Sequence, residues 1–152
     1  MTPQIKIIVL LFATLVVCAS AVTDASAFGL GVIVGEPTGL SYKSFLTQKV
    51  AIDGALAWGF ANEEALQVHF DVLFHGKSLG TANGGRFPIY FGAGLRMKFD
   101  DTNNIALRVP VGLVLMFDKM PMDLFMETVP MIQIDPGDDI SLDIAFGARY
   151  YF

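Results

Sequence analysis

The sequence predicts an all-β fold, an eight-stranded antiparallel up-and-down transmembrane β-barrel that follows a cleaved signal peptide. Three observations predict it. The chain has 152 residues, of which 53% are hydrophobic and only 16% are charged, whereas about 25% of residues are charged in a typical soluble domain. Apolar residues alternate with small or charged residues over long segments. Fifteen glycines suit strands and turns better than membrane-spanning helices.

The first segment of the chain has the pattern of a secretory signal peptide, which we place at residues 1–27. Its basic start at Lys6 precedes the apolar run 7–17, and small residues then lead to Ala25-Ser26-Ala27. A basic start, an apolar middle and an A-x-A end are typical of such peptides. We therefore expect cleavage before Phe28 and one exported barrel domain over residues 28–152. A retained membrane anchor is the alternative for this segment.

Alternation at every second position is the main evidence for strands. In each of the segments 87–99, 105–117 and 140–152, one alternate set of seven positions is entirely apolar. The other set holds every charged residue of the segment. Because successive side chains of a strand point to opposite faces, each segment predicts a strand with one apolar face. Each segment is also longer than the roughly 9 to 11 tilted residues that cross a bilayer.

We expect eight strands, at 28–35, 38–47, 50–60, 65–75, 86–99, 104–117, 122–134 and 139–152. Strands in lipid must close into a ring, since an open edge would leave backbone polar groups unpaired. Turn-forming residues such as Asn83-Gly84-Gly85 separate the strands, and 75–86 is the longest expected connection. Pro110 and Pro130 fall within strands, so each should mark a bulge or a missing ladder bond.

A soluble barrel of the lipocalin type, with the apolar faces turned inward, is the alternative fold. Such a barrel needs a charged exterior, whereas the second face here is rich in glycine, alanine and valine. We therefore expect the apolar faces to meet lipid, with an aromatic girdle at each interface. The girdle residues are Trp58, Phe60 and Phe99 at one rim, and Phe74, Phe87, Phe117, Tyr150 and Phe152 at the other.

With the apolar faces outward, the second face encloses a network of charged residues. Eight strands surround a space only just wide enough for side chains, so we expect these charges to pair. A general porin is therefore disfavoured, and a narrow ion-conducting pore remains an alternative. The expected lumen residues are Lys43, Asp53, Asp71, Arg96, Lys98, Arg108, Glu127, Asp143 and Arg149.

The two rims are expected to differ in charge. We expect both termini to face the periplasm, which makes the outer rim acidic: Glu36, Glu63, Glu64, Asp100, Asp101, Asp135, Asp138 and Asp139. These residues are either solvated turn residues or a collar for divalent cations or a basic extracellular partner. The opposite rim carries Lys49, Lys77, Arg86 and Lys119 with Asp118 and Asp123. The net charge of −5 disfavours nucleic acid as a partner.

Few residues suggest catalysis or metal binding. His69, Asp71 and His75 share one face, but the mature chain offers no cysteine and no third histidine as further ligands. A lipid-modifying outer-membrane enzyme, the main alternative from another class, would need a histidine and a serine to meet on the barrel. Ser41, Ser44, Ser78 and Ser141 are the candidates, and none lies in a G-x-S-x-G turn. We therefore expect no catalytic residue, no metal and no cofactor.

Short motifs spread over residues 28–152 add a resemblance to a known group. They include GEPTGLS at 35–41, RVPVG at 108–112, FDKMP at 117–121 and GARYYF at 147–152. These motifs resemble small barrels of the OmpA and OmpX type, and more closely a family of uncharacterised barrels in diderm bacteria, including spirochaetes. The resemblance implies an outer-membrane location, contact with outer-membrane lipid, and insertion by the barrel assembly machinery through Phe152. We expect a structural or surface-interaction role.

Overall fold

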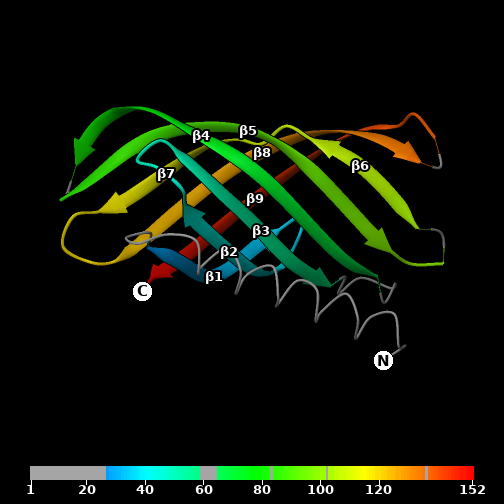
Figure 1. Cartoon of the computed structure of the whole chain (residues 1–152), viewed down its shortest axis with the longest axis horizontal. Helices are drawn as coiled ribbons and strands as arrows, with labels where there is room; N and C mark the ends of the chain where they lie inside the picture. The colour runs from blue at the N-terminus through cyan, green and yellow to red at the C-terminus, as the bar shows by residue number, and fades with distance from the viewer. Residues whose placement is uncertain (1–26, 59–64, 83, 102, 136) are drawn as a thin grey trace.

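The described residues form nine β-strands that close into one antiparallel ring (Figure 1). The computed structural model describes residues 27–58, 65–82, 84–101, 103–135 and 137–152, so the expected signal peptide, Phe60, Glu63 and Glu64 lie outside the described residues. The strands are β1 (Phe28–Gly35), β2 (Gly39–Phe45), β3 (Val50–Trp58), β4 (Leu66–Ala82), β5 (Gly85–Phe99), β6 (Asn104–Arg108), β7 (Val111–Phe117), β8 (Met122–Asp135) and β9 (Ile140–Tyr151).

The ring confirms the predicted eight-stranded barrel, because β6 and β7 share one position in it. Both pair with β5 on one side and with β8 on the other. Neighbouring strands pair in chain order around the wall, and β9 closes the ring by pairing with β1 from Gly29↔Tyr151 to Gly35↔Ala145. Within the described parts of the chain, no helix is long and apolar enough to cross a membrane.

The break between β6 and β7 lies at the two prolines that the sequence analysis singled out. The Gly92 N–H donates to the Pro110 carbonyl (2.9 Å), and the Val109 N–H donates to the Pro130 carbonyl (3.0 Å). A hydrogen-bonded antiparallel pair exchanges two bonds, but Pro130 has no N–H to return the second one to Val109. Val109, the residue before Pro110, is therefore held to Pro130 by one ladder bond instead of two.

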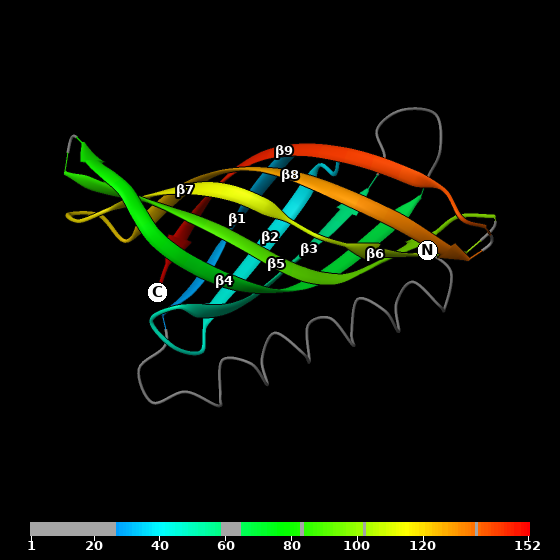
Figure 2. The same ribbon diagram turned by 90° about the horizontal axis from the view of Figure 1, so that it is seen from above.

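The expected long connection at 75–86 is wrong, because this segment is mostly strand. β4 continues to Ala82, the turn lies at Gly84 (φ 74°), and β5 begins at Gly85. Two register shifts interrupt the pairing, one on each side of Ser78. The segment lacks an alternating apolar face, and so gives no period-two signal, yet backbone ladder bonds need no such pattern. Figure 2 shows this hairpin extending past the ends of β2 and β3.

Side chains alternate between the outside and the inside of the ring as the sequence predicts. Leu107 and Ile144 are 46% and 53% exposed, whereas their neighbours Arg108 and Asp143 are 1% and 7% exposed. The apolar faces thus point outward and the charges are enclosed. This arrangement contradicts the lipocalin-type alternative.

Glycines on the inner face make room for large rings in the narrow lumen. A Cβ at Gly112 would overlap the ring of Tyr90, and a Cβ at Gly147 would overlap the ring of Phe125. Both rings are buried. Each ring lies close to the glycine on the adjacent paired strand and fills space that would otherwise be open.

We expect the substitution Gly112→Ala to lower the free energy of unfolding by about 1–3 kcal/mol, because the Tyr90 ring must move to admit the methyl group. The matched control is Gly80→Ala in the β4–β5 hairpin, where an added Cβ meets nothing within 4 Å. Urea unfolding of the refolded protein in detergent micelles measures both. Equal unfolding midpoints for the two variants would contradict the packing described here.

Candidate functional site

Arg108, the last residue of β6, joins three parts of the barrel wall. Its Nε donates to both carboxylate oxygens of Asp71 on β4, at 3.0 and 3.2 Å. Its Nη2 lies 3.6 Å from Oε1 of Glu127 on β8. All three side chains are buried. One guanidinium group therefore contacts two carboxylates from strands on either side of its own.

Arg149 on β9 forms a second cluster. Its Nε donates to Oδ1 of Asp123 (3.0 Å), and its Nη1 donates to Oδ2 of Asp53 on β3 (3.4 Å). The Tyr151 hydroxyl donates to the other oxygen of Asp123 (2.6 Å). The guanidinium carbon also lies 4.0 Å from the ring centroid of Phe125. This geometry is that of a cation–π contact.

Asp123 is a residue that the sequence analysis misplaced. We expected it at the rim beside Asp118, because the predicted strand began only one residue earlier. In the structure it is fully buried. Its register partner on β9 is Arg149, so the carboxylate lies beside the guanidinium group that it neutralises. The alternation signal was available, since Asp123 has the same parity as Glu127 on β8.

Lys43 lies near the end of the lumen that holds the chain termini. Its Nζ is 2.8 Å from Nε2 of His75. The ammonium group also lies 5.0 Å from the ring centroid of Phe45 and 5.3 Å from that of Tyr90. The Tyr90 hydroxyl in turn donates to Oε2 of Glu127 (2.8 Å). Tyr90 thus connects the Lys43 group to the Arg108 cluster, a role that the sequence analysis missed although its parity matched that of Arg96.

Toward the opposite mouth the pairs are more exposed. Arg96 Nη1 lies 3.6 Å from Oδ2 of Asp143. Lys98 Nζ lies 3.2 Å from Oδ2 of Asp100, where the two side chains are 33% and 23% exposed. The last pair joins an expected lumen residue to an expected rim residue. The charged network is therefore buried at the centre of the barrel and partly exposed to solvent at this mouth.

Side chains fill the middle of the barrel. Arg108, Arg149, Tyr90 and Lys43 are among the largest side chains that are almost completely buried. Charges enclosed in this way are tolerated only when they are paired, because each would otherwise lose its hydration without replacement. The arrangement connects strands across the lumen and fills its centre with side chains.

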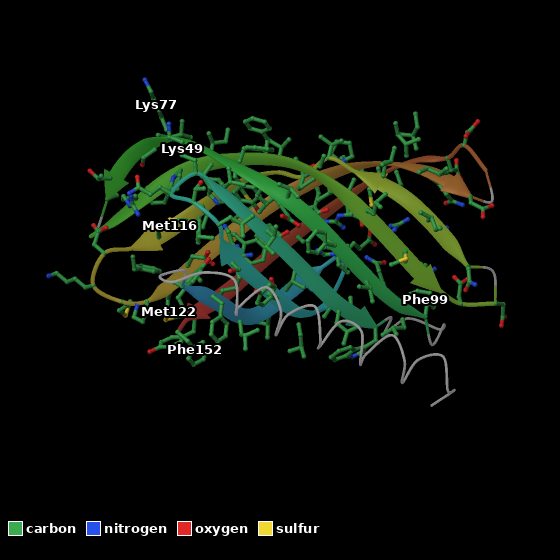
Figure 3. The ribbon with its side chains drawn as sticks, in the orientation of Figure 1. Lys49, Lys77, Phe99, Met116, Met122 and Phe152 are labelled. Carbon is green, nitrogen blue, oxygen red and sulfur yellow. The ribbon has the colours of Figure 1, made fainter. Side chains whose placement is uncertain are left out.

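The described acidic residues of the expected rim share one end of the barrel. Figure 3 places Phe99 at one end, and Lys49, Lys77 and Phe152 at the other. The turns β1–β2, β5–β6 and β8–β9 share the Phe99 end, so Glu36, Asp100, Asp101, Asp135, Asp138 and Asp139 lie there. Among the described residues, no group of three or more His, Cys, Asp or Glu side chains is placed to hold one metal ion.

Among the described aromatic residues of the expected girdles, Phe74 lies in the middle of β4 and the others lie near the strand ends. Trp58, Phe74, Tyr150 and Phe152 are exposed, while Phe87, Phe99 and Phe117 are partly exposed. Phe152 stacks on Phe28 with ring centroids 5.4 Å apart. The pair joins the outer surfaces of β1 and β9 at the end that holds the termini.

The histidines do not meet a serine. His75 contacts Lys43 through Nε2, and the nearest ionic partner of His69 is Asp71, at 3.9 Å. Nδ1 of each ring has no hydrogen-bond partner among the described residues. The histidine–serine pair that a lipid-modifying enzyme would need is not formed by these two rings.

Comparison with known proteins supports the fold. The crystal structure of the N-terminal β-barrel domain of Pseudomonas aeruginosa OprF is similar to this chain, with a TM-score of 0.54 and 14% sequence identity. The match covers 84% of this chain and 96% of that domain. This chain shares the barrel fold of the OprF domain. No protein-family model and no curated protein sequence matches it.

We expect Arg108→Met to lower the free energy of unfolding by about 3–5 kcal/mol, because it leaves Asp71 and Glu127 buried without their cation. Adding Asp71→Asn should recover part of the loss, since the two residues interact directly. The control Lys98→Met, at the exposed mouth, should cost about 1 kcal/mol or less. Urea titration of all variants measures these values. A strictly additive double variant would argue against the pairing.

Proposed function

We propose that this chain is an integral outer-membrane β-barrel with a structural or surface-interaction role, whose lumen is plugged by a charged network. The main support for this proposal is the apolar outer surface of the barrel. Each of the nine described strands contributes an exposed large apolar side chain, for example Val32, Leu40, Trp58, Phe74, Phe91, Leu107, Val111, Leu124 and Leu142. An apolar surface that runs around the whole wall exceeds what a monomer exposes to water, and it suits hydrocarbon.

Three further observations support the outer membrane as the compartment. Closed barrels with an even number of strand positions are typical of bacterial outer membranes. The expected signal peptide would export the chain. The fold is also that of the OprF barrel domain. We infer that both termini face the periplasm and that the acidic rim lies outside the cell.

In this orientation the acidic rim would meet divalent cations or a basic partner at the cell surface. Because no three described carboxylates converge, the rim would act through its summed negative charge rather than through a single metal centre. Outer-membrane lipid and the barrel assembly machinery are the remaining expected partners. The exposed Phe152, stacked on Phe28, is available for the assembly contact.

We propose a non-enzymatic role and no general porin activity. The filled centre of the barrel supports the second point, because a solute would have to displace Arg108, Tyr90 and Glu127 together. The separation of the histidines from serine supports the first. In this proposal the barrel wall is a scaffold and the rims are the surfaces for interaction.

Fractionation of the cell envelope tests this proposal. We expect the protein in the outer-membrane fraction, and on a detergent gel we expect unboiled and boiled samples to migrate differently, because a closed barrel resists the detergent until it is heated. A periplasmic soluble protein with no change in mobility on boiling would overturn the proposal.

Substitution on the apolar belt tests whether it lies in hydrocarbon. Leu107→Arg near the middle of the wall should lower the free energy of unfolding in lipid vesicles by about 2–4 kcal/mol, whereas Ile140→Arg at the strand end should cost about 0–1 kcal/mol. Both side chains are exposed in the structure, so simple loss of packing predicts little difference. Equal effects of the two substitutions would contradict a membrane-embedded belt.

A further inference from the structure

The mouth at the Phe99 end encloses a cavity of about 610 Å³. The β1–β2 turn and the ends of β3, β4, β5, β6, β8 and β9 line this cavity, which we call the vestibule. Its volume falls within the roughly 300–1,000 Å³ of small-molecule sites. The filled centre of the barrel forms its floor, so a ligand could enter from one side without passing through.

The charged groups of the vestibule are already paired with one another. Arg96 lies against Asp143 (3.6 Å), and Lys98 lies against Asp100 (3.2 Å). An anion would have to compete with these carboxylates for the two cations. It would also approach past the acidic rim, which repels negative charge. A cation would be disfavoured by the positive charges of Arg96 and Lys98 in the cavity wall.

Neutral hydrogen-bonding groups make up much of the remaining lining. Gln67, Lys98 and Asn104 are register partners on β4, β5 and β6, so they form one row across three adjacent strands. Gln133 and Ser141 contribute from β8 and β9. Such a row places the Gln67 and Asn104 amides two strand spacings, about 10 Å, apart, so a ligand that meets both must extend over more than one sugar ring.

Three side chains that line the vestibule carry buried polar atoms without partners, as Arg108 and Arg149 do deeper in the lumen. Gln67 Nε2 and Arg96 Nε are donors, and Asn104 Oδ1 is an acceptor, and none of them has a hydrogen-bond partner among the described residues. Buried polar atoms left unpaired carry a free-energy cost. A hydroxyl group both donates and accepts, so adjacent hydroxyls can satisfy donors and acceptors that alternate along a wall.

We propose that the vestibule binds a neutral, hydroxyl-rich ligand of the carbohydrate class. Its charges cancel in pairs, its lining side chains carry unpaired donors and an unpaired acceptor, and Trp58 lies at its edge. The inference rests on the surface-interaction role proposed above only for the side from which the ligand arrives. The binding chemistry itself depends on the barrel alone.

The single tryptophan of the chain reports on this site. We expect maltose or N,N′-diacetylchitobiose, titrated into the refolded full-length protein in detergent micelles, to change the Trp58 fluorescence saturably. Gln67→Leu and Asn104→Leu should each weaken the apparent affinity by about tenfold, as the loss of one hydrogen bond to the ligand predicts. The matched control Gln48→Leu, exposed in the β2–β3 turn at the opposite end, should leave it unchanged.

Inorganic phosphate and spermidine serve as charged comparison probes and should bind more weakly than either sugar. Tighter saturable binding of phosphate or spermidine would overturn the inference, as would the absence of a saturable response to both sugars. Equal affinities of the Gln67→Leu, Asn104→Leu and Gln48→Leu variants would overturn it as well. Mobility on unboiled gels separates the two proposals, since a protein that keeps its heat-dependent shift but binds no sugar remains a barrel.

Discussion

The structure depends on two arginines enclosed among carboxylates. Arg108 connects β6 to Asp71 on β4 and Glu127 on β8, while Arg149 connects β9 to Asp53 on β3 and Asp123 on β8. Charges inside a narrow ring must find partners there, because little water can replace them. The same enclosure leaves the apolar face of every strand outside. The paired interior and the apolar exterior therefore have one cause: the charged face of each strand points into the lumen.

Because side chains fill the middle of the lumen, the two ends of the barrel are the places where a ligand can bind. The side chains at the centre are buried, the termini end carries lysines, and the other end carries a polar vestibule below an acidic rim. The pairs become more exposed along the axis, from the buried Arg108–Asp71 bond to the Lys98–Asp100 contact, whose side chains are 33% and 23% exposed. Groups that are not needed to close the interior are therefore found at the mouth, where a ligand can use them.

The success of the sequence prediction depended on whether a segment had one apolar face. The ends of strands β5, β8 and β9 were predicted to within one or two residues because outward-facing and lumen-facing positions alternate along them. The β4–β5 hairpin beyond residue 75 was missed, since glycine, serine and threonine there have no such contrast while the backbone still pairs. Asp123 was placed at the rim because the alternation along β8 does not say how far β9 extends beside the first residues of β8.

The sequence by itself determined the fold class, the inward charged residues other than Asp123, and the two prolines that interrupt the ladder. These follow from local rules, the period of a strand and the missing N–H of proline. Only the tertiary structure decided which charges pair, that Tyr90 joins Glu127 to the Lys43 group, and that Gln67, Lys98 and Asn104 form one row. Partners depend on register and on approach across the lumen, and residues 96 positions apart meet there only once the ring has closed.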